Sequence, residues 1–320
     1  TDGALMCGTS IFAQYASNIF NMVLIYKKDE MWTLTWTVQD GITIWERYQV
    51  SPNIGCGAPR TLKTLSIELE KNINQAKTIA IWRGNRGIYI SNGQSPMCVS
   101  DDIDSVFDQT CTPHVNLAMI EKEVGFVDHA NLEYHWLWAS GSNTTLDKEY
   151  VLDMSTWRWF EIDRTSGVRL QMGIDVTDQY GNQYTYGFLN DGDMVRLENG
   201  NTFISNDITA TMEFGAQILI AQDPLSETSV QQANLIAIAK NTDSTVTLTH
   251  TLDGSTGSGT DYTLSVADGS HRFVNLITDI FSAAGVFHEF KLSAVTDDEV
   301  KSFEPLYFSV FYIKERDHMQ

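Results

Sequence analysis

Large apolar and polar side chains alternate through residues 134–163, and two polar turns divide this stretch into three short segments. Successive side chains of a β-strand point to opposite faces, so the alternation predicts three strands, each with one aromatic face. The residues that share these faces are Tyr134, Trp136 and Trp138, then Tyr150, Leu152 and Met154, then Trp157 and Trp159, with Phe160 and Ile162 opposite them. Aromatic side chains pack across strands, which favours the buried core of an antiparallel sheet. The alternative is an exposed platform on which a sugar or a base stacks.

The same alternation continues towards residue 198, with short turns between the segments. Residues 168–176 predict an unbroken half-buried strand, residues 177–182 a turn rich in Asp, Gly and Asn, and residues 184–188 the next strand. A second turn at residues 190–193 precedes a strand at residues 194–198. Strands separated by turns at this spacing are typical of an antiparallel meander, as in a propeller blade, a barrel or a sandwich.

Further strand-like segments precede this region. They lie at residues 22–27, 32–38, 42–49, 65–69, 79–82 and 87–90, whereas residues 1–20 show no assignable pattern. Asp40 and Gly41 form a strong hairpin signal between two of these segments. Residues 52–59 are rich in Gly and Pro and predict a loop, and residues 85–87 predict a turn.

A short helix is expected at residues 100–107, where the alternation stops. Ser100 is a candidate N-cap, and Asp101 and Asp102 would lie in the first turn, where acidic side chains are favourable. The apolar residues directed inward would be Ile103, Val106 and Phe107.

A short internal repeat links two distant segments. Residues 88–103 and 194–208 each read as a strand, an Asn-Gly turn and an exit that contains Ser, Asp and Ile. Repeated sheet units are what a propeller requires, because one blade cannot bury both of its faces alone.

The composition of the chain changes near Thr209, where aromatic residues become rarer and Thr, Ala and Ser more frequent. Strands are expected around residues 245–249, 262–266, 285–295 and 303–314. The segment from Leu306 to Ile313 is apolar on both faces, which is typical of a strand inside a stack of sheets or between protomers. The sequence therefore predicts an all-β fold, with antiparallel meander sheets of β-propeller type over residues 1–208 and a β-sandwich-like unit over residues 209–320.

Composition and charge narrow the classes of function. The chain has 320 residues, of which 42% are hydrophobic and 19% charged, so it can bury a sizeable core. Its net charge of −20 argues against binding to a nucleic-acid backbone and against binding to an anionic membrane. No apolar run is long enough to span a bilayer, and the start shows no signal peptide. Because the sequence begins at Thr1 and not at Met, it is expected to be a processed product or the later part of a longer chain.

The four cysteines lack the Cys-x-x-Cys spacing of a zinc or redox motif, so free thiols are expected. A disulfide between Cys98 and Cys111 is the alternative. The seven histidines show no metal-ligand spacing, and His135 between aromatic residues is expected to be a core histidine.

Turn carboxylates are the remaining candidates for chemistry. The acidic and amide residues Asp175, Asp178, Asn182, Asp191 and Asp193 could offer oxygen ligands to calcium, but ordinary turn chemistry is the favoured interpretation. Ser140 lacks the pattern of a nucleophile elbow, and the sequence contains no phosphate-binding glycine loop. A glycosidase needs two facing carboxylates, and no local motif selects such a pair. No catalytic, cofactor-binding or metal-binding residue is therefore assigned, and no cofactor is expected.

Three segments resemble the β-propeller tail proteins of tailed bacteriophages, a family that includes tail nozzle, tail hub and tail tubular proteins. They are residues 136–163, residues 87–93 together with 99–103, and residues 303–306. The resemblance implies a structural, non-enzymatic virion protein, assembled in the host cytoplasm. It would form a homo-oligomeric ring, often sixfold, with other tail or portal-adaptor proteins around the channel through which DNA leaves. An acidic channel wall would let DNA slide without sequence-specific binding. The alternative is a propeller-type carbohydrate-binding protein or glycosidase, which the aromatic and acidic content of residues 136–163 motivates.

Overall fold

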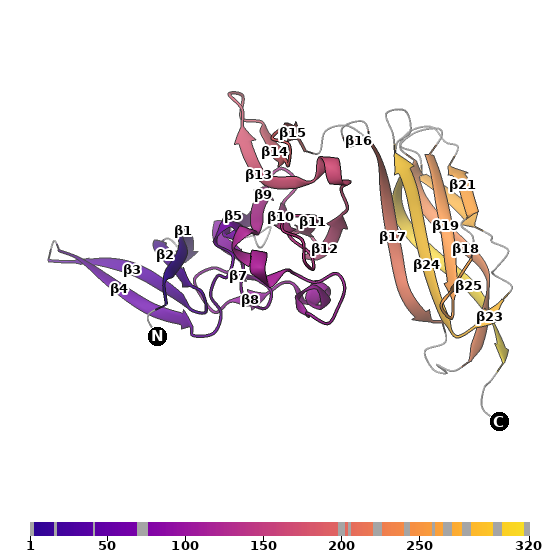
Figure 1. Ribbon diagram of the computed structural model, residues 1–320, viewed down its shortest axis with the longest axis horizontal. Coiled ribbons are helices and arrows are strands. Elements are labelled where there is room, and N and C mark those ends of the chain that lie inside the picture. The colour runs from indigo at the N-terminus through magenta and orange to yellow at the C-terminus, as the bar shows by residue number, and fades with distance from the viewer. Residues whose placement is uncertain are drawn as a thin grey trace. The chain divides into compact units, whose positions relative to one another are not determined.

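The computed structural model describes residues 3–15, 18–40, 42–68, 76–197, 202–203, 206–219, 226–239, 244–257, 260–264, 271–276, 283–296 and 303–316. The chain divides into two compact units, residues 1–198 and 199–320. Strands dominate the described part of both units, and every strand pair found there is antiparallel, so the predicted all-β class is confirmed (Figure 1).

The first unit contains four consecutive meander sheets. The first sheet has the order β1 (Leu5–Tyr15), β2 (Asn18–Lys27), β3 (Met31–Gln39) and β4 (Ile42–Ser51). The second has β5 (Lys63–Glu68), β6 (Ala76–Arg83), β7 (Ile88–Ser91) and β8 (Met97–Cys98). The third has β9 (Val124–Asp128), β10 (Glu133–Trp138), β11 (Lys148–Asp153) and β12 (Arg158–Ile162), and the fourth has β13 (Leu170–Thr177), β14 (Gln183–Leu189) and β15 (Met194–Arg196). Short 3₁₀ helices connect them at Pro59–Thr61, Asp101–Phe107, Leu117–Lys122 and Ser166–Val168.

The first strands of the four sheets pack together. Strand β9 contacts both β5 and β13, and β1 contacts β5 and β6. Glycine makes the β9–β13 contact possible, because a Cβ at Gly173 of β13 would lie within 3.0 Å of the Phe126 ring of β9. A small pocket described below is lined by parts of these four first strands, β1, β5, β9 and β13.

The aromatic faces expected from the sequence form the core of the first unit. Tyr134, Trp136 and Trp138 are fully buried, and the Trp136 and Trp138 rings stack with centroids 5.3 Å apart. They pack with apolar residues of the second sheet, including Ile81 and Ile88. The core interpretation is confirmed, and the alternative of an exposed stacking platform is wrong for these side chains.

The second unit has two sheets whose apolar faces meet. One contains β16 (Thr202–Phe203), β17 (Asn206–Ile218), β24 (Phe287–Thr296), β19 (Ser244–Leu252), β20 (Ser255–Thr256) and β21 (Thr260–Leu264). The other contains β18 (Glu227–Ala239), which pairs with β22 (His271–Leu276), β23 (Ala284–Gly285) and β25 (Phe303–Arg316). Leu235 of β18, Leu248 of β19 and Phe290 of β24 lie in the shared core, with Phe308 of β25 packed against it.

Several local expectations need correction. The helix after Ser100 is a 3₁₀ helix, and Ser100 does not cap it; its hydroxyl accepts a hydrogen bond from the backbone N–H of Ile88 at 3.0 Å instead. Trp157 does not share the face of a strand with Trp159, because it lies in the turn before β12 with a positive φ of 57°. Strand β1 falls in the segment that had no assignable pattern. Strand β13 begins at Leu170 and not at Val168, because a 3₁₀ turn precedes it.

Candidate functional site

A pocket with a polar lining lies where three loops of the first unit meet. The turn between β2 and β3, the loop after β4 and the turn between β6 and β7 enclose a volume of about 750 Å³. We call it the rim pocket, and its lining residues are Asp29, Asn53, Ile54, Asn85, Arg86 and Tyr89. The loop at residues 52–59 and the turn at residues 85–87 were both expected from the sequence.

Close backbone contacts hold these loops together. The N–H of Cys56 donates to the carbonyl of Lys27 at 2.9 Å, and the N–H of Gly57 donates to the carbonyl of Arg83 at 3.1 Å. The indole Nε1 of Trp82 donates to the carbonyl of Gly55 at 2.9 Å. A Cβ at Gly55 would overlap the backbone of Lys27, so only glycine lets the loop approach this turn. The rim pocket therefore has a fixed backbone frame.

Below the rim, Arg83 anchors the β6–β7 turn in the core. Its guanidinium donates to the carbonyl of Gly84 and lies 3.5 Å from the carboxylate of Glu123, both side chains being almost fully buried. Trp136 Nε1 donates to the same carboxylate at 2.9 Å. Burial raises the pKa of Glu123 to about 7, although Arg83 and Trp136 act in the opposite direction. This cluster supports the turn from beneath and does not line the pocket.

The pocket combines hydrogen-bonding groups of different kinds with one aromatic ring. Asn85 donates to the carboxylate of Asp29 and to the carbonyl of Lys28 at 3.3 Å. Within the described part of the chain, no hydrogen bond is found for the side chains of Asn53, Arg86 or Tyr89. Tyr89 is half-buried, and burial followed by the nearby Cys98 raises the pKa of its phenol. The pocket thus offers amide, carboxylate, guanidinium and phenol groups to a ligand.

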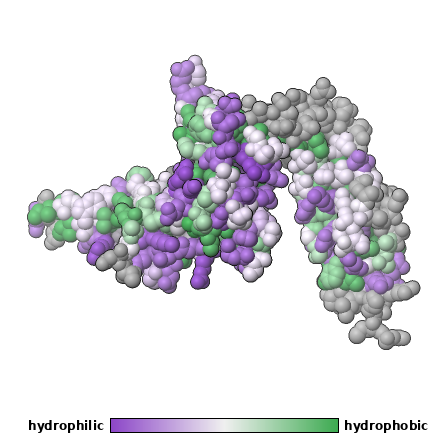
Figure 2. All heavy atoms as spheres, in the orientation of Figure 1, coloured by the Kyte–Doolittle hydropathy of each residue, from purple (hydrophilic) through white to green (hydrophobic). Residues whose placement is uncertain are grey.

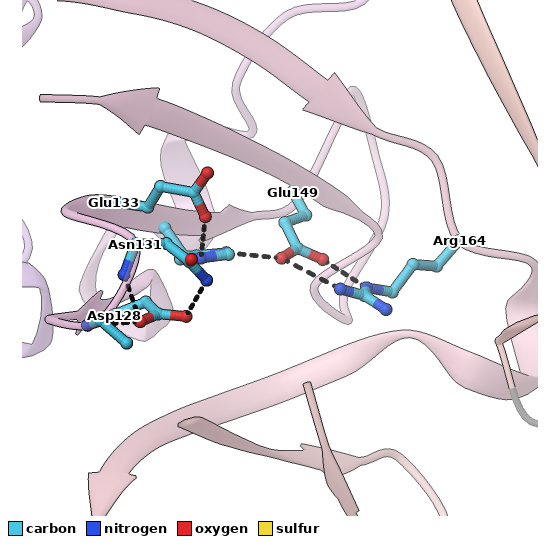
Figure 3. Close-up of polar contacts among 7 residues, drawn as sticks. Asp128, Asn131, Glu133, Glu149 and Arg164 are labelled. Carbon is cyan, nitrogen blue, oxygen red and sulfur yellow. Dashed lines mark hydrogen bonds and ion pairs between the residues drawn. The ribbon is translucent and has the colours of Figure 1, made fainter. Parts of the chain in front are cut away.

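A second charged cluster is buried in the third sheet (Figure 3). Glu149 of β11 accepts from Nε of Arg164 at 2.5 Å, and its other oxygen lies 2.8 Å from Nδ1 of His135 on β10. Glu133 approaches Nε2 of the same imidazole at 3.6 Å. Burial would lower the pKa of His135, but hydrogen bonds with Glu133 and Glu149 outweigh it and raise the pKa to about 9. His135 is therefore a paired core histidine, and its two charged partners are Glu133 and Glu149.

Two of the carboxylates singled out in the sequence, Asp178 and Asp191, follow ordinary turn chemistry, whereas Asp175 lies on strand β13 and pairs with His129. Asp178 accepts from the backbone N–H groups of Tyr180 and Asn182 at 2.8 and 2.9 Å. Asp191 accepts from the N–H of Asp193 at 3.1 Å. In the described ranges, no group of three His, Cys, Asp or Glu side chains could hold a metal ion. Ser140 donates to Asp147 at 2.7 Å, which places its hydroxyl in a turn.

The structure also bears on the expectations about the cysteines and about membrane-spanning segments. All four cysteines are free thiols, so Cys98 and Cys111 do not form the disulfide considered above. No helix among the described residues combines the length and apolarity needed to cross a bilayer. The rim pocket itself was not predicted, because its six residues come from three loops and no local motif marks them.

No family model and no curated protein matches this chain. Among solved structures, it is similar to a glycoside hydrolase family 43 arabinoxylan arabinofuranohydrolase from Bacillus subtilis, with 9% identity, 96% of this chain and 78% of that chain covered, and a TM-score of 0.30. An exo-β-1,3-galactanase from Phanerochaete chrysosporium matches with 9% identity, 91% and 78% coverage and a TM-score of 0.28. A carbohydrate-binding module of the β-sandwich superfamily matches with 8% identity, 96% and 98% coverage and a TM-score of 0.23.

These comparisons correct the functional interpretation of the sequence. The solved structures described above are glycoside hydrolases and a carbohydrate-binding module, so the interpretation as a bacteriophage tail protein that lacks enzymatic activity is wrong. With TM-scores of 0.30 or below, the likeness carries no activity over to this chain. The function proposed next therefore rests on the geometry of the rim pocket.

Proposed function

We propose that the first unit binds a carbohydrate in the rim pocket. The observation that carries this proposal is the set of polar side chains without a side-chain hydrogen bond among the described residues, Asn53, Arg86 and Tyr89, around one pocket. A sugar presents many hydroxyl groups, each of which both donates and accepts, and it needs such a mixed set of partners. The C–H face of a sugar ring also packs on an aromatic side chain, a role open to Tyr89.

The size and frame of the pocket support a ligand of this class. A volume of about 750 Å³ lies within the range of small-molecule sites and accommodates more than one sugar ring. Asp29 is held by Asn85, which fixes the carboxylate in position for vicinal hydroxyls. A preformed set of partners reduces the entropy lost on binding.

The architecture that presents the pocket is proposed to be of β-propeller type. Four consecutive meander sheets, each with its first strand against the first strand of a neighbour, support this assignment. The two facing sheets of the second unit similarly support a β-sandwich. In such a propeller, the rim pocket lies on loops between the first two blades.

The test is a glycan array with the whole chain, followed by calorimetry with the best ligand. Arg86→Ala and Asn53→Ala should each weaken binding about tenfold or more, because a hydrogen bond to a charged or amide group is lost. Arg158→Ala is the matched control, since Arg158 is exposed and lies outside the pocket. Absence of any retained glycan, or equal binding by all three variants, would contradict the proposal.

The same ligand should be tested for turnover. Hydrolysis of a glycosidic bond uses two carboxyl groups, and the lining of the rim pocket supplies one, Asp29. Release of reducing ends, compared between the native chain and Asp29→Asn, separates binding from catalysis. Turnover that disappears in Asp29→Asn would place a reaction in this pocket.

A further inference from the structure

A second pocket lies where the first strands of the four sheets meet. It has a volume of about 350 Å³ and is lined by short segments of β1, β5, β9 and β13 together with residues that flank them. We call it the inner-strand pocket. The lining side chains that matter here are Lys63 of β5, His129 after β9 and Asp175 of β13. It shares no lining residue with the rim pocket.

Lys63 is a half-buried cation in this pocket. The pKa of its ammonium group is lowered, mainly by burial and to a smaller extent by the positive charge of the nearby Arg60. No carboxylate of a described residue forms an ion pair with it, although the chain as a whole has a net charge of −20. Partly desolvated charges in proteins are normally paired, so the position calls for an anion.

Asp175 supplies the complementary acceptor. Its Oδ2 pairs with Nδ1 of His129 at 2.5 Å, and this contact orients the imidazole. Its Oδ1 is buried and has no hydrogen-bond partner within the described ranges. A buried carboxylate oxygen without a donor is costly, so a hydroxyl group of a ligand would stabilise it.

The lining also leaves room for a ligand beside these charges. Gly8 of β1 and Gly173 of β13 contribute no side chain, and Thr9 and Thr64 add hydroxyl groups. The volume is near the lower end of the range for small-molecule sites, which limits the occupant to roughly one sugar-sized molecule.

We propose that the inner-strand pocket binds a small carboxylate that carries hydroxyl groups, of the sugar-acid class. The carboxylate of the ligand contacts Lys63, and one of its hydroxyl groups donates to Oδ1 of Asp175. An anion without a hydroxyl group leaves Asp175 without its donor, and a neutral sugar leaves Lys63 without its counter-charge. The proposal does not depend on carbohydrate binding in the rim pocket.

The experiment is calorimetric titration of the whole chain with D-gluconate, with D-glucose and acetate as the two comparison ligands. Gluconate should bind at least tenfold more tightly than either, because only gluconate offers both groups. Lys63→Met and Asp175→Asn should each weaken gluconate binding about tenfold to a hundredfold. Lys122→Met, at an exposed lysine outside both pockets, should bind as the native chain does.

Circular dichroism and the thermal midpoint of each variant establish that it is folded. If Lys63→Met does not fold, Lys63→Arg is tested in its place. Lys63→Arg keeps the positive charge and should retain most of the affinity for gluconate. Three results would overturn the proposal: no heat with gluconate, equal affinity for gluconate and glucose, or unchanged gluconate affinity in folded Lys63→Met.

Discussion

Glu149 is the residue on which the buried charges of the third sheet depend. One of its oxygens contacts Arg164 and the other contacts His135, and all three side chains are buried. Burial alone would raise the pKa of Glu149, but these two cations outweigh it and hold the pKa below its usual value. The carboxylate is therefore ionised in the folded chain and compensates two positive groups at once.

Replacement of this carboxylate should be costly. In Glu149→Gln, Arg164 and His135 lose the buried carboxylate that they share, although Glu133 remains near His135, and we expect the free energy of unfolding to fall by about 3–5 kcal/mol. Urea unfolding followed by tryptophan fluorescence reports on this unit, because all eight tryptophans lie before residue 160.

The matched control is Glu161→Gln, whose partner Lys148 forms an ion pair on a partly exposed surface. Because exposed pairs contribute little, this change should cost less than about 1 kcal/mol. Equal losses in the two variants would show that the buried position of Glu149 has no special importance.

At the scale of single residues, the sequence predicted which charged side chain is buried, but it did not predict which carboxylates pair with that side chain. His135 between aromatic residues was expected in the core, and it is fully buried. Glu133 lies on the same strand, but the partner at hydrogen-bond distance, Glu149, lies on the neighbouring strand and 14 positions further along the chain. Which carboxylate meets which imidazole depends on strand register, and a one-residue slip would turn every side chain to the other face. Single-sequence patterns do not determine that register.

Two adjacent strands of the second unit bring a pair of neutral imidazoles together. His250 of β19 and His288 of β24 are buried, and their Nε2 and Nδ1 atoms lie 3.0 Å apart. Burial is the larger cause, and electrostatic repulsion from His288 the smaller cause, that lower the pKa of His250 to about 4. The groups facing His288 are Thr228 Oγ1 at 2.8 Å, the carbonyl of Gly285 at 3.3 Å and the charge of Asp253.

The second unit should therefore become less stable as the pH falls from about 6.5 to 4. In that window the unfolded chain takes up a proton at His250, whereas the folded chain does not, so the free energy of unfolding falls with decreasing pH. The slope should reach up to about 1.4 kcal/mol per pH unit, and His250→Gln should reduce it. Thermal unfolding by far-ultraviolet circular dichroism at several pH values measures this effect. His114→Gln in the first unit is the control, and an unchanged slope in His250→Gln would contradict the explanation.

The contact between β9 and β13 is a second feature at the scale of elements. A Cβ at Gly173 would overlap the ring of Phe126, so β13 lies against β9 only because this position lacks a side chain. We expect Gly173→Ala to lower the free energy of unfolding by about 1–3 kcal/mol through overpacking. Gly167→Ala is the control, because a Cβ there meets nothing within 4 Å. Equal stability of the two variants would show that the β9–β13 contact adjusts without cost.

Elements with strict alternation were predictable, and those fixed by tertiary contacts were not. Residues 32–38 and 42–49 read as strands because Trp, Ile and Tyr alternate with polar residues, and β3 and β4 cover them. Strand β1 contains Gly8, Thr9 and Ser10 and lacks such a pattern, and its pairing with β2 makes it a strand. Trp157 was placed on a strand by its apolar character, but its left-handed backbone conformation puts it in a turn.

For the whole molecule, the sequence predicted the class of fold and neither of the two pockets. The rim pocket joins residues 29, 53 and 86, and the inner-strand pocket joins residues 63, 129 and 175. The rim pocket forms where the first two sheets meet and the inner-strand pocket where all four sheets meet, so no local spacing reveals either of them. The aromatic residues that first suggested a carbohydrate platform are core residues, and the polar pockets arise elsewhere.

Two surfaces of the described residues expose large apolar side chains. One is the hairpin of β3 and β4, where Trp36, Val38, Ile42 and Trp45 are exposed, and apolar atoms are visible along it in Figure 2. The other is the outer face of β25, where the exposed fractions of Tyr307, Phe311 and Ile313 are 58%, 58% and 53%. Exposed apolar patches of this kind on a long strand favour association with another chain.

We propose that β25 pairs with the same strand of a second copy. Among the described strands, the hydrogen-bonded partner of β25 is β18, and Tyr307, Phe311 and Ile313 stay exposed on the outer face of β25. An antiparallel pair about a twofold axis satisfies both edges alike and covers Tyr307 and Phe311 of each copy. Tyr307→Lys should convert dimers into monomers, as read by mass photometry, while circular dichroism stays unchanged. Thr211→Lys, at an exposed strand position of the other sheet, should leave the assembly intact. A native chain that remains monomeric at high concentration would refute the pairing, because the exposed apolar face of β25 would then be stable without a second copy.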